Sequence, residues 1–191
     1  MAKTESTLKN MVLSLTLIAL TAATALGFVY EVTKKPIEVT VLNKKLAAIK
    51  AVVPAFDNNP DREMFRLADE NGDSLEIYPA RSGEAVVGYA VKTFSMNGFS
   101  GYIGIMAGFS PNGSITGTNV LEHKETPGLG TKMTEDAFKT QFNGKDPSSF
   151  TMKVRKDGGQ VDAITAATIT SRAFCEAVDR AYKTLKKGGL I

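Results

Sequence analysis

Cysteine and histidine are scarce in this 191-residue chain, which contains one of each, Cys175 and His123. A single cysteine excludes a disulfide bond within the chain, and one cysteine with one histidine cannot form a zinc site alone. We expect Cys175 to be a small half-buried residue of a helix and His123 to be a surface or hydrogen-bonding residue. A Cys175–His123 nucleophile pair is formally possible but has no local support, and we predict no metal centre and no independent catalytic site.

A strong excess of one charge and the glycine-rich motifs that bind phosphate are also missing. The chain has 23 lysine and arginine residues against 20 acidic residues, and a net charge of +3 gives no support for a nucleic-acid partner. Neither G-x-x-x-x-G-K-[ST] nor G-x-G-x-x-G occurs, so we expect no nucleotide-binding turn of those types. The length suits one domain with a proper core and is too short for two large ones.

A long uncharged run lies near the N-terminus. Residues 11–30 contain no charged residue and no proline, and 20 residues is the length that a helix needs to cross a bilayer. We predict a short tail at 1–10 and a retained transmembrane helix at 11–30. Its hydroxyl residues suggest a face that packs on other membrane helices. The alternatives are a signal peptide cleaved near residues 24–27, and a buried core helix, which the lack of a polar face disfavours.

The rest of the chain alternates between helical and strand patterns. We expect a break at 34–36, and then a helix at 39–53 that Pro54 ends. Strands are predicted at 75–78, 85–93, 103–109, 115–122 and 150–154, with a loop at 97–102 and a hairpin turn at 110–114. A short helix is predicted at 134–142, with Thr134 as its cap and with Ala137, Phe138 and Phe142 facing inward. A last helix is predicted to end near Lys187.

This order predicts an α+β fold with a mostly antiparallel sheet and flanking helices. The predicted organisation is the transmembrane helix, a helical connector at 31–60 and a globular domain at 61–191.

Two stretches carry residues suited to chemistry. Residues 165–171 hold four hydroxyl side chains where the last helix begins, and the unpaired N–H groups of a helix start favour a phosphate. The alternative is a plain helix cap. Residues 125–130 place two glycines around one apolar residue, which lets the backbone approach a flat or charged ligand closely. The alternative there is an ordinary turn between a strand and a helix.

Taken together, LEHKETPGLG (121–130) and DAITAATITS (162–171) resemble the covalent FMN-binding domain family. Its members include the G subunit of the Rnf complex and the C subunit of the sodium-translocating NADH:quinone reductase. The resemblance covers most of the chain, and the chain length favours a G-type subunit over a C-type one.

In that family the second motif reads roughly Asp-x-x-Ser/Thr-Gly-Ala-Thr/Ser-x-Thr, and a flavin transferase esterifies the FMN phosphate to the last threonine. The matching residues here are Asp162, Thr165, Ala167, Thr168 and Thr170. The resemblance implies covalent FMN on Thr170, with Asp162 recognised by the transferase. The hydroxyls of Thr165, Thr168 and Ser171 are expected near the phosphate.

Ala166 departs from the family motif, which has glycine at this position. We expect the added methyl group to be tolerated if φ at residue 166 is negative.

The first motif matches the family in full, and there it lies against the flavin. The implied cofactor-binding residues of this loop are Glu125, Thr126, Gly128, Leu129 and Gly130. We expect its backbone and the Leu129 side chain to contact the isoalloxazine ring and to influence its redox potential.

The resemblance implies a single-pass electron-transfer subunit of a redox-driven, ion-translocating ferredoxin:NAD oxidoreductase in the bacterial cytoplasmic (inner) membrane. Its partners would be the other subunits and, during maturation, the flavin transferase. The family places the FMN domain outside the cytoplasm, whereas the lysines that follow the span favour the inside; a long domain weakens that charge rule, so we follow the family. The alternative from another class is an anchored, flavin-free binding or scaffold domain.

Overall fold

The computed structural model describes residues 7–191, so the first six residues of the predicted tail lie outside the described part. The chain divides into two compact units, Met1–Asn43 and Lys44–Ile191. The first contains most of one long helix, and the second contains a sheet, the end of that helix and the remaining helices.

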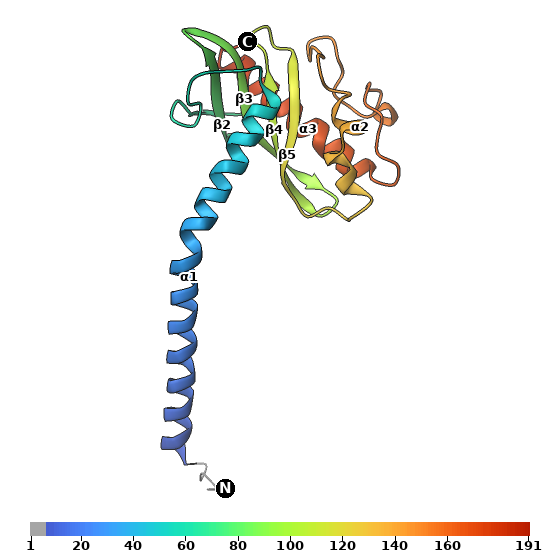
Figure 1. Ribbon diagram of the computed structural model, residues 1–191. Coiled ribbons are helices and arrows are strands. Elements are labelled where there is room, and N and C mark those ends of the chain that lie inside the picture. The colour runs from blue at the N-terminus through green and yellow to red at the C-terminus, as the bar shows by residue number, and fades with distance from the viewer. Residues whose placement is uncertain (1–6) are drawn as a thin grey trace. The chain divides into compact units, whose positions relative to one another are not determined.

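Helix α1 (Leu8–Val52) supplies the one described segment that is long and apolar enough to cross a membrane (Figure 1). The apolar side chains of its N-terminal part are exposed. The hydroxyls of Ser14, Thr21 and Thr24 donate hydrogen bonds of 2.9, 2.9 and 2.8 Å to carbonyl oxygens one turn earlier. These hydroxyls are therefore satisfied within the helix itself.

The break expected at 34–36 is wrong, because α1 continues through Pro36. Proline removes one helical hydrogen bond, but its fixed φ is close to the helical value, so the turns on either side can continue. The Thr40 hydroxyl donates a 2.8 Å hydrogen bond to the Pro36 carbonyl within this segment. The end of the helix before Pro54 is as predicted.

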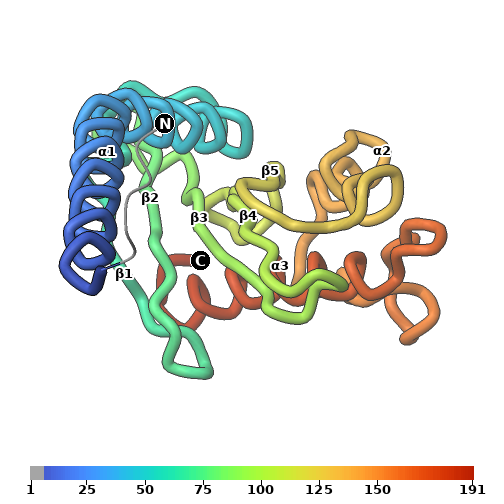
Figure 2. The backbone as a smooth tube through the Cα atoms, turned by 90° about the horizontal axis from the view of Figure 1, so that it is seen from below, coloured from blue at the N-terminus to red at the C-terminus, as the bar shows by residue number. Residues whose placement is uncertain are grey.

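Five strands form one antiparallel sheet in chain order, which confirms the predicted fold class (Figures 1 and 2). They are β1 (Phe65–Ala68), β2 (Ser74–Ser82), β3 (Ala85–Gly98), β4 (Gly101–Phe109) and β5 (Ile115–His123). Strand β1 was not predicted, because four residues are too few to show a clear alternation. The expected loop at 97–102 is instead a tight hairpin, since β3 runs to Gly98 and β4 starts at Gly101.

Successive side chains of a strand point to opposite faces of the sheet, so alternate residues belong to two separate cores. Ile77, Val91 and Ile105 belong to the core shared with helix α3 (Thr168–Lys187). Their neighbours Tyr78, Ala90 and Met106 belong to a core shared with Ala48, Ile49 and Val52 of α1. Each face of the sheet is therefore covered by a different helix, and α3 crosses β3 and β4 (Figure 2).

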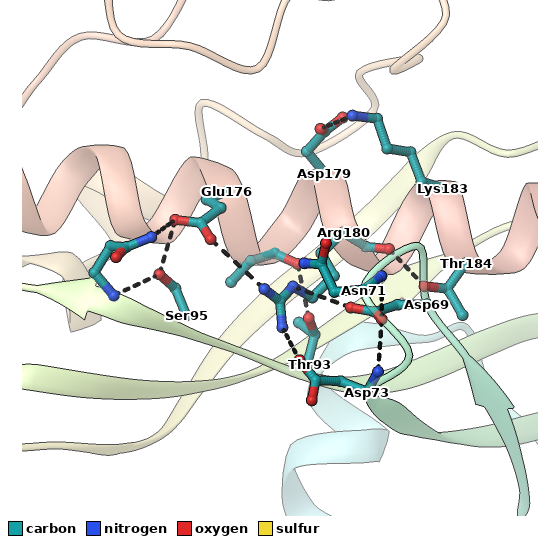
Figure 3. Close-up of polar contacts among 12 residues, drawn as sticks. Asp69, Asn71, Asp73, Thr93, Ser95, Glu176, Asp179, Arg180, Lys183 and Thr184 are labelled. Atoms are coloured by element: carbon teal, nitrogen blue, oxygen red, sulfur yellow. Dashed lines mark hydrogen bonds and ion pairs between the residues drawn. The ribbon is translucent and has the colours of Figure 1, made fainter.

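Arg180 of α3 provides the main polar attachment of this helix to the sheet side (Figure 3). Its guanidinium lies 3.5 Å from Asp69, 3.3 Å from Asp73 and 3.7 Å from Glu176. The same group lies over the Phe94 ring at 4.6 Å from the centroid, a cation–π contact. The Asp69 side chain is 3% exposed, and Arg180 is the cation that compensates the burial of its carboxylate.

Two shorter elements differ from prediction. The helix expected at 134–142 is a 3-10 turn, η1 (Gly130–Thr134), followed by α2 (Asp136–Lys139), whose cap residue is Glu135 and not Thr134. Phe138 and Phe142 point inward as expected, but Ala137 is exposed.

The strand predicted at 150–154 is wrong. Val154 forms only an isolated bridge with Val161, and the segment between them contains a second 3-10 turn, η2 (Arg155–Asp157). Met152 and Val154 are nevertheless buried in the core beneath α3. The alternating pattern therefore reports burial against that core and not membership of the sheet.

We expect Arg180→Ala to lower the free energy of unfolding by about 3 kcal/mol, because it leaves the buried Asp69 carboxylate without its cation. In the full chain in detergent, the melting temperature should fall by roughly 6–12 °C. The readout is thermally induced maleimide labelling of Cys175, which is 2% exposed in the folded chain.

The matched control is Lys183→Ala on the same helix, whose partner Asp179 lies 2.8 Å away at the surface. This variant should lose less than about 0.5 kcal/mol. Equal melting temperatures for the two variants would contradict the role assigned to Arg180.

Candidate functional site

A cavity of about 310 Å³ lies where three segments distant in sequence meet. It is lined by the β3–β4 hairpin, by the loop after β5 and by the start of α3. The lining residues are Phe99, Glu125, Thr126, Leu129, Gly130, Ala166, Ala167, Thr168, Ile169 and Thr170. The two stretches singled out in the sequence therefore form one site.

The loop after β5 is shaped by glycine. Gly128 has φ +75°, a conformation that favours glycine, and its N–H donates a 2.9 Å hydrogen bond to the Thr131 hydroxyl. The Leu129 N–H donates to the Thr126 carbonyl at 3.2 Å, which closes the turn. The Leu129 side chain remains 41% exposed beside the cavity.

Thr170 and Glu125 form a buried hydrogen bond at the inner end of the cavity. The Thr170 hydroxyl donates to Glu125 Oε2 at 2.7 Å, and the two residues are 1% and 5% exposed. Gly130 allows this contact, because a Cβ at that position would lie 2.4 Å from Glu125 Oε2 and 2.9 Å from Thr170 Oγ1. Gly130 therefore allows the two motifs to approach each other closely.

The start of α3 has no side-chain cap. Its cap residue is Ala167, which makes no side-chain hydrogen bond. Within the part of the chain that the structure describes, the backbone N–H groups of Thr168, Ile169 and Thr170 donate no hydrogen bond. These groups line the cavity with the positive end of the helix dipole, an arrangement that suits an anion.

Ser171 is not available for the phosphate, contrary to expectation. Its hydroxyl accepts a 3.0 Å hydrogen bond from the Ile164 N–H and donates one of 3.0 Å to the Ala167 carbonyl. It is fully buried and holds the turn that precedes α3.

Ala166 has φ +61° and is the one described non-glycine residue with a positive φ. The condition under which its methyl group was expected to be tolerated is therefore not met. A left-handed conformation costs a residue with a Cβ about 1 kcal/mol or more relative to glycine. The departure from the family motif thus falls at the position where glycine would relieve backbone strain.

Three predicted residues lie away from this cavity. Gly128 shapes the loop without lining the cavity, and Asp162 and Thr165 line a separate depression with Gln141. Asp162 is exposed and forms an ion pair of 2.5 Å with Arg155. Asp162 therefore does not line the cavity.

Two apolar residues of the cavity, Phe99 and Ile169, were missed as site residues. In the unit Lys44–Ile191, the large apolar side chains that remain exposed are Met96, Phe99, Leu129 and Ile169. Three of these four line the cavity, and such a grouping of exposed apolar side chains marks a binding surface. The available signal was a phenylalanine placed between the two glycines of a tight turn.

Neither Cys175 nor His123 takes part in chemistry at the cavity. Burial raises the pKa of the Cys175 thiol to about 12, so it is not a nucleophile near neutral pH. The Nδ1 atom of His123 accepts a 3.2 Å hydrogen bond from the Glu125 backbone N–H. The histidine thereby fixes the start of the loop.

We expect Ala166→Gly to raise the free energy of unfolding by about 1 kcal/mol, because it relieves the positive φ. Thermally induced labelling of Cys175 should then occur roughly 2–4 °C higher than in the unsubstituted chain. The control is Ala137→Gly at an exposed helical position, which should lower stability by about 0.5–1 kcal/mol. A loss of stability in both variants would contradict the strain at residue 166.

Comparisons with known proteins identify the family of this chain. The FMN-binding domain family matches residues 98–183, a range that includes all three segments around the cavity. Among solved structures, the fold is similar to that of the C subunit of the Na(+)-translocating NADH-quinone reductase from Parabacteroides distasonis. The TM-score is 0.51 over 68% of this chain and 67% of that chain, with 20% identity, so this likeness concerns the fold alone.

Closer relatives cover nearly the whole chain. The G subunit of the Na(+)-translocating ferredoxin:NAD(+) oxidoreductase complex of Acetobacterium woodii is 34% identical, over 92% of this chain and 91% of that protein. The G subunit of the ion-translocating oxidoreductase complex of Aliivibrio fischeri is 35% identical, over 94% and 92%. The chain therefore belongs to the FMN-binding domain family, among the G subunits of ion-translocating oxidoreductase complexes.

Proposed function

We propose that this chain is the electron-transfer subunit of a membrane-bound, ion-translocating ferredoxin:NAD oxidoreductase and carries FMN as a phosphoester on Thr170. The observation that carries the proposal is the cavity itself. It brings together the Thr170 hydroxyl, unpaired helix N–H groups and an apolar rim, from both motifs and the β3–β4 hairpin.

The start of α3 is suited to the phosphate. An ester on Thr170 would lie beside the N–H groups of residues 168–170, which have no protein partner in the described chain. The Thr168 hydroxyl also lines the cavity, whereas Thr165 does not. The donors and the helix dipole together stabilise negative charge at this point.

The apolar rim is suited to the ring. Phe99, from the β3–β4 hairpin, and Leu129, from the loop after β5, both line the cavity and remain exposed. When bound, FMN supplies one- and two-electron transfer, and the protein supplies its position and surroundings. Apolar side chains shield a ring from water while leaving an edge open to an electron partner.

Helix α1 is suited to anchor the protein in the membrane among the other subunits of the complex. The relatives are named as subunits of complexes, so partners are expected along the span and around the domain. The hydroxyls of Thr21 and Thr24 are hydrogen-bonded to backbone carbonyls of the same helix, which lowers the free-energy cost of exposing them to lipid. We place the flavin domain on the extracytoplasmic side and name a flavin transferase as the maturation partner.

Two alternatives have weaker support. A flavin-free scaffold domain would give no reason for a cavity rimmed by exposed apolar residues over uncapped helix N–H groups. A C-type protein of the quinone reductase shares the fold, but the relatives that cover most of this chain are named as G subunits.

Covalent flavin on Thr170 predicts a fluorescent band when the chain, expressed with a flavin transferase, is run on a denaturing gel under ultraviolet light. Thr170→Ala should abolish the fluorescence, because no other cavity hydroxyl occupies that position. Thr170→Ser, which keeps a hydroxyl at this position, is the control and should retain it. Fluorescence that survives Thr170→Ala would place the ester on another residue.

The proposed orientation predicts the labelling of single cysteines on the two sides of the span. In a Cys175→Ser background, a membrane-impermeant maleimide should label Lys34→Cys in intact cells, and Lys9→Cys only after permeabilisation. Both positions are exposed on α1, so differences in burial do not interfere. The reverse pattern would put the domain in the cytoplasm.

A further inference from the structure

The Glu125 carboxylate is buried in direct contact with the proposed attachment hydroxyl. Its Oε2 atom accepts the 2.7 Å hydrogen bond from Thr170, and its Oε1 atom accepts a 3.0 Å bond from the Ser100 N–H. The residue is 5% exposed. Both carboxylate oxygens are thus held, and one of them points at the atom that would form the ester.

Two glycines make room for this carboxylate. A Cβ at Gly98 would lie 2.8 Å from Glu125 Oε1, and one at Gly130 would lie 2.4 Å from Oε2. Strand β3, the loop after β5 and α3 therefore all meet at the same carboxyl group. The backbone at both glycines lies close to the Glu125 carboxylate, and neither position has space for a side chain.

Stability alone does not account for a carboxylate at this position. Among the described residues, no ion pair involves Glu125, although burying a carboxylate without a cation is costly. The titratable side chain in hydrogen-bond contact with this residue is His123, through the Glu125 backbone N–H. A buried, cation-free carboxylate aimed at a hydroxyl is the arrangement of a general base.

We propose that Glu125 is the general base of flavin attachment and takes the proton of the Thr170 hydroxyl as that oxygen attacks the phosphorus atom. The inference rests on the proposed function, because it concerns the same ester. A threonine hydroxyl is a weak nucleophile until an adjacent base removes its proton. Glu125 supplies that base from within the acceptor chain.

The step balances with an activated flavin donor. FMN has no good leaving group on its phosphate, so the donor is a flavin dinucleotide, in which a pyrophosphate joins FMN to a second nucleotide. The bond from Thr170 Oγ1 to phosphorus forms and the bridging P–O bond breaks. A nucleoside monophosphate leaves, and the proton moves from Thr170 Oγ1 to Glu125 Oε2. No oxidant or reductant is needed.

A base from the transferase would have poor access to this hydroxyl. Thr170 is 1% exposed, and the direction in which its hydroxyl donates is already occupied by Glu125. An external side chain would have to displace a carboxylate held between two glycines and a backbone N–H. The donor phosphate needs only the open side of the cavity.

The same proton transfer also suits the finished site. Two negative groups in contact at a buried position disfavour one another, so a phosphoester beside an ionised Glu125 would be costly. After the transfer the carboxyl is neutral and can donate a hydrogen bond to a phosphate oxygen. The proton that leaves Thr170 thus removes the repulsion that the ester would otherwise meet.

The test compares rates of flavin attachment to the purified full chain in detergent, with a flavin transferase and flavin adenine dinucleotide. In Glu125→Gln the amide oxygen can keep the Ser100 bond and the amide group can donate to Thr170, so only the base is lost. We expect the rate at pH 7 to fall by roughly 10²-fold or more. The residual rate should rise about tenfold per pH unit, as expected for hydroxide as the base.

A second variant separates chemistry from folding. Glu125→Ala leaves a small space beside Thr170, and added formate should restore part of the rate by acting as the missing base. Glu122→Gln, the same change at an exposed carboxylate of β5, serves as the matched control and should keep the rate and pH profile of the unsubstituted chain. Protection of Cys175 from maleimide verifies that each variant is folded.

Each outcome separates this inference from the function on which it rests. Attachment to Thr170 in the unsubstituted chain, with an unchanged rate in Glu125→Gln, would overturn the base and leave the ester standing. A folded Glu125→Ala chain that formate does not rescue would also overturn it. An unsubstituted chain that takes up no flavin would overturn the proposed function together with the inference.

Discussion

The packing of α3 across β3 and β4 is the interaction on which the rest of the domain depends. Phe174, Ala177 and Val178 form the apolar part of this contact, and Arg180 forms the polar part with the buried Asp69. Because α3 is one continuous helix, its packing on the sheet also fixes the position of its first turn. The position of Thr170 beside the loop after β5 thus follows from packing about one to three turns further along the helix.

The sequence predicted the fold class, the last helix and the central hairpin, because these have strong periodicity and clear turn signals. It failed where local rules compete with tertiary structure. Pro36 was taken to break a helix that continues through it, and the alternation at 150–154 reflects burial against α3 without strand pairing.

The site was predictable in its parts but not in its assembly. The motif residues of both stretches could be read from the chain, whereas the contact between Glu125 and Thr170 spans 45 positions and depends on the fold. Phe99 was missed because a lone aromatic in a turn has no periodic context, and its one signal was its place between Gly98 and Gly101. The sign of φ at Ala166 is set by the turn that Ser171 closes, and no local pattern reveals it.

The lone thiol of the chain has a consequence for where the protein can operate. Cys175 is buried in the core under α3, and burial raises its pKa to about 12, so the folded chain presents almost no thiolate to its surroundings. Thiol–disulfide exchange needs an accessible thiolate. The thiol redox potential of the compartment therefore does not affect the folded domain. An oxidising environment does not cross-link it through Cys175, and its stability does not depend on a disulfide bond.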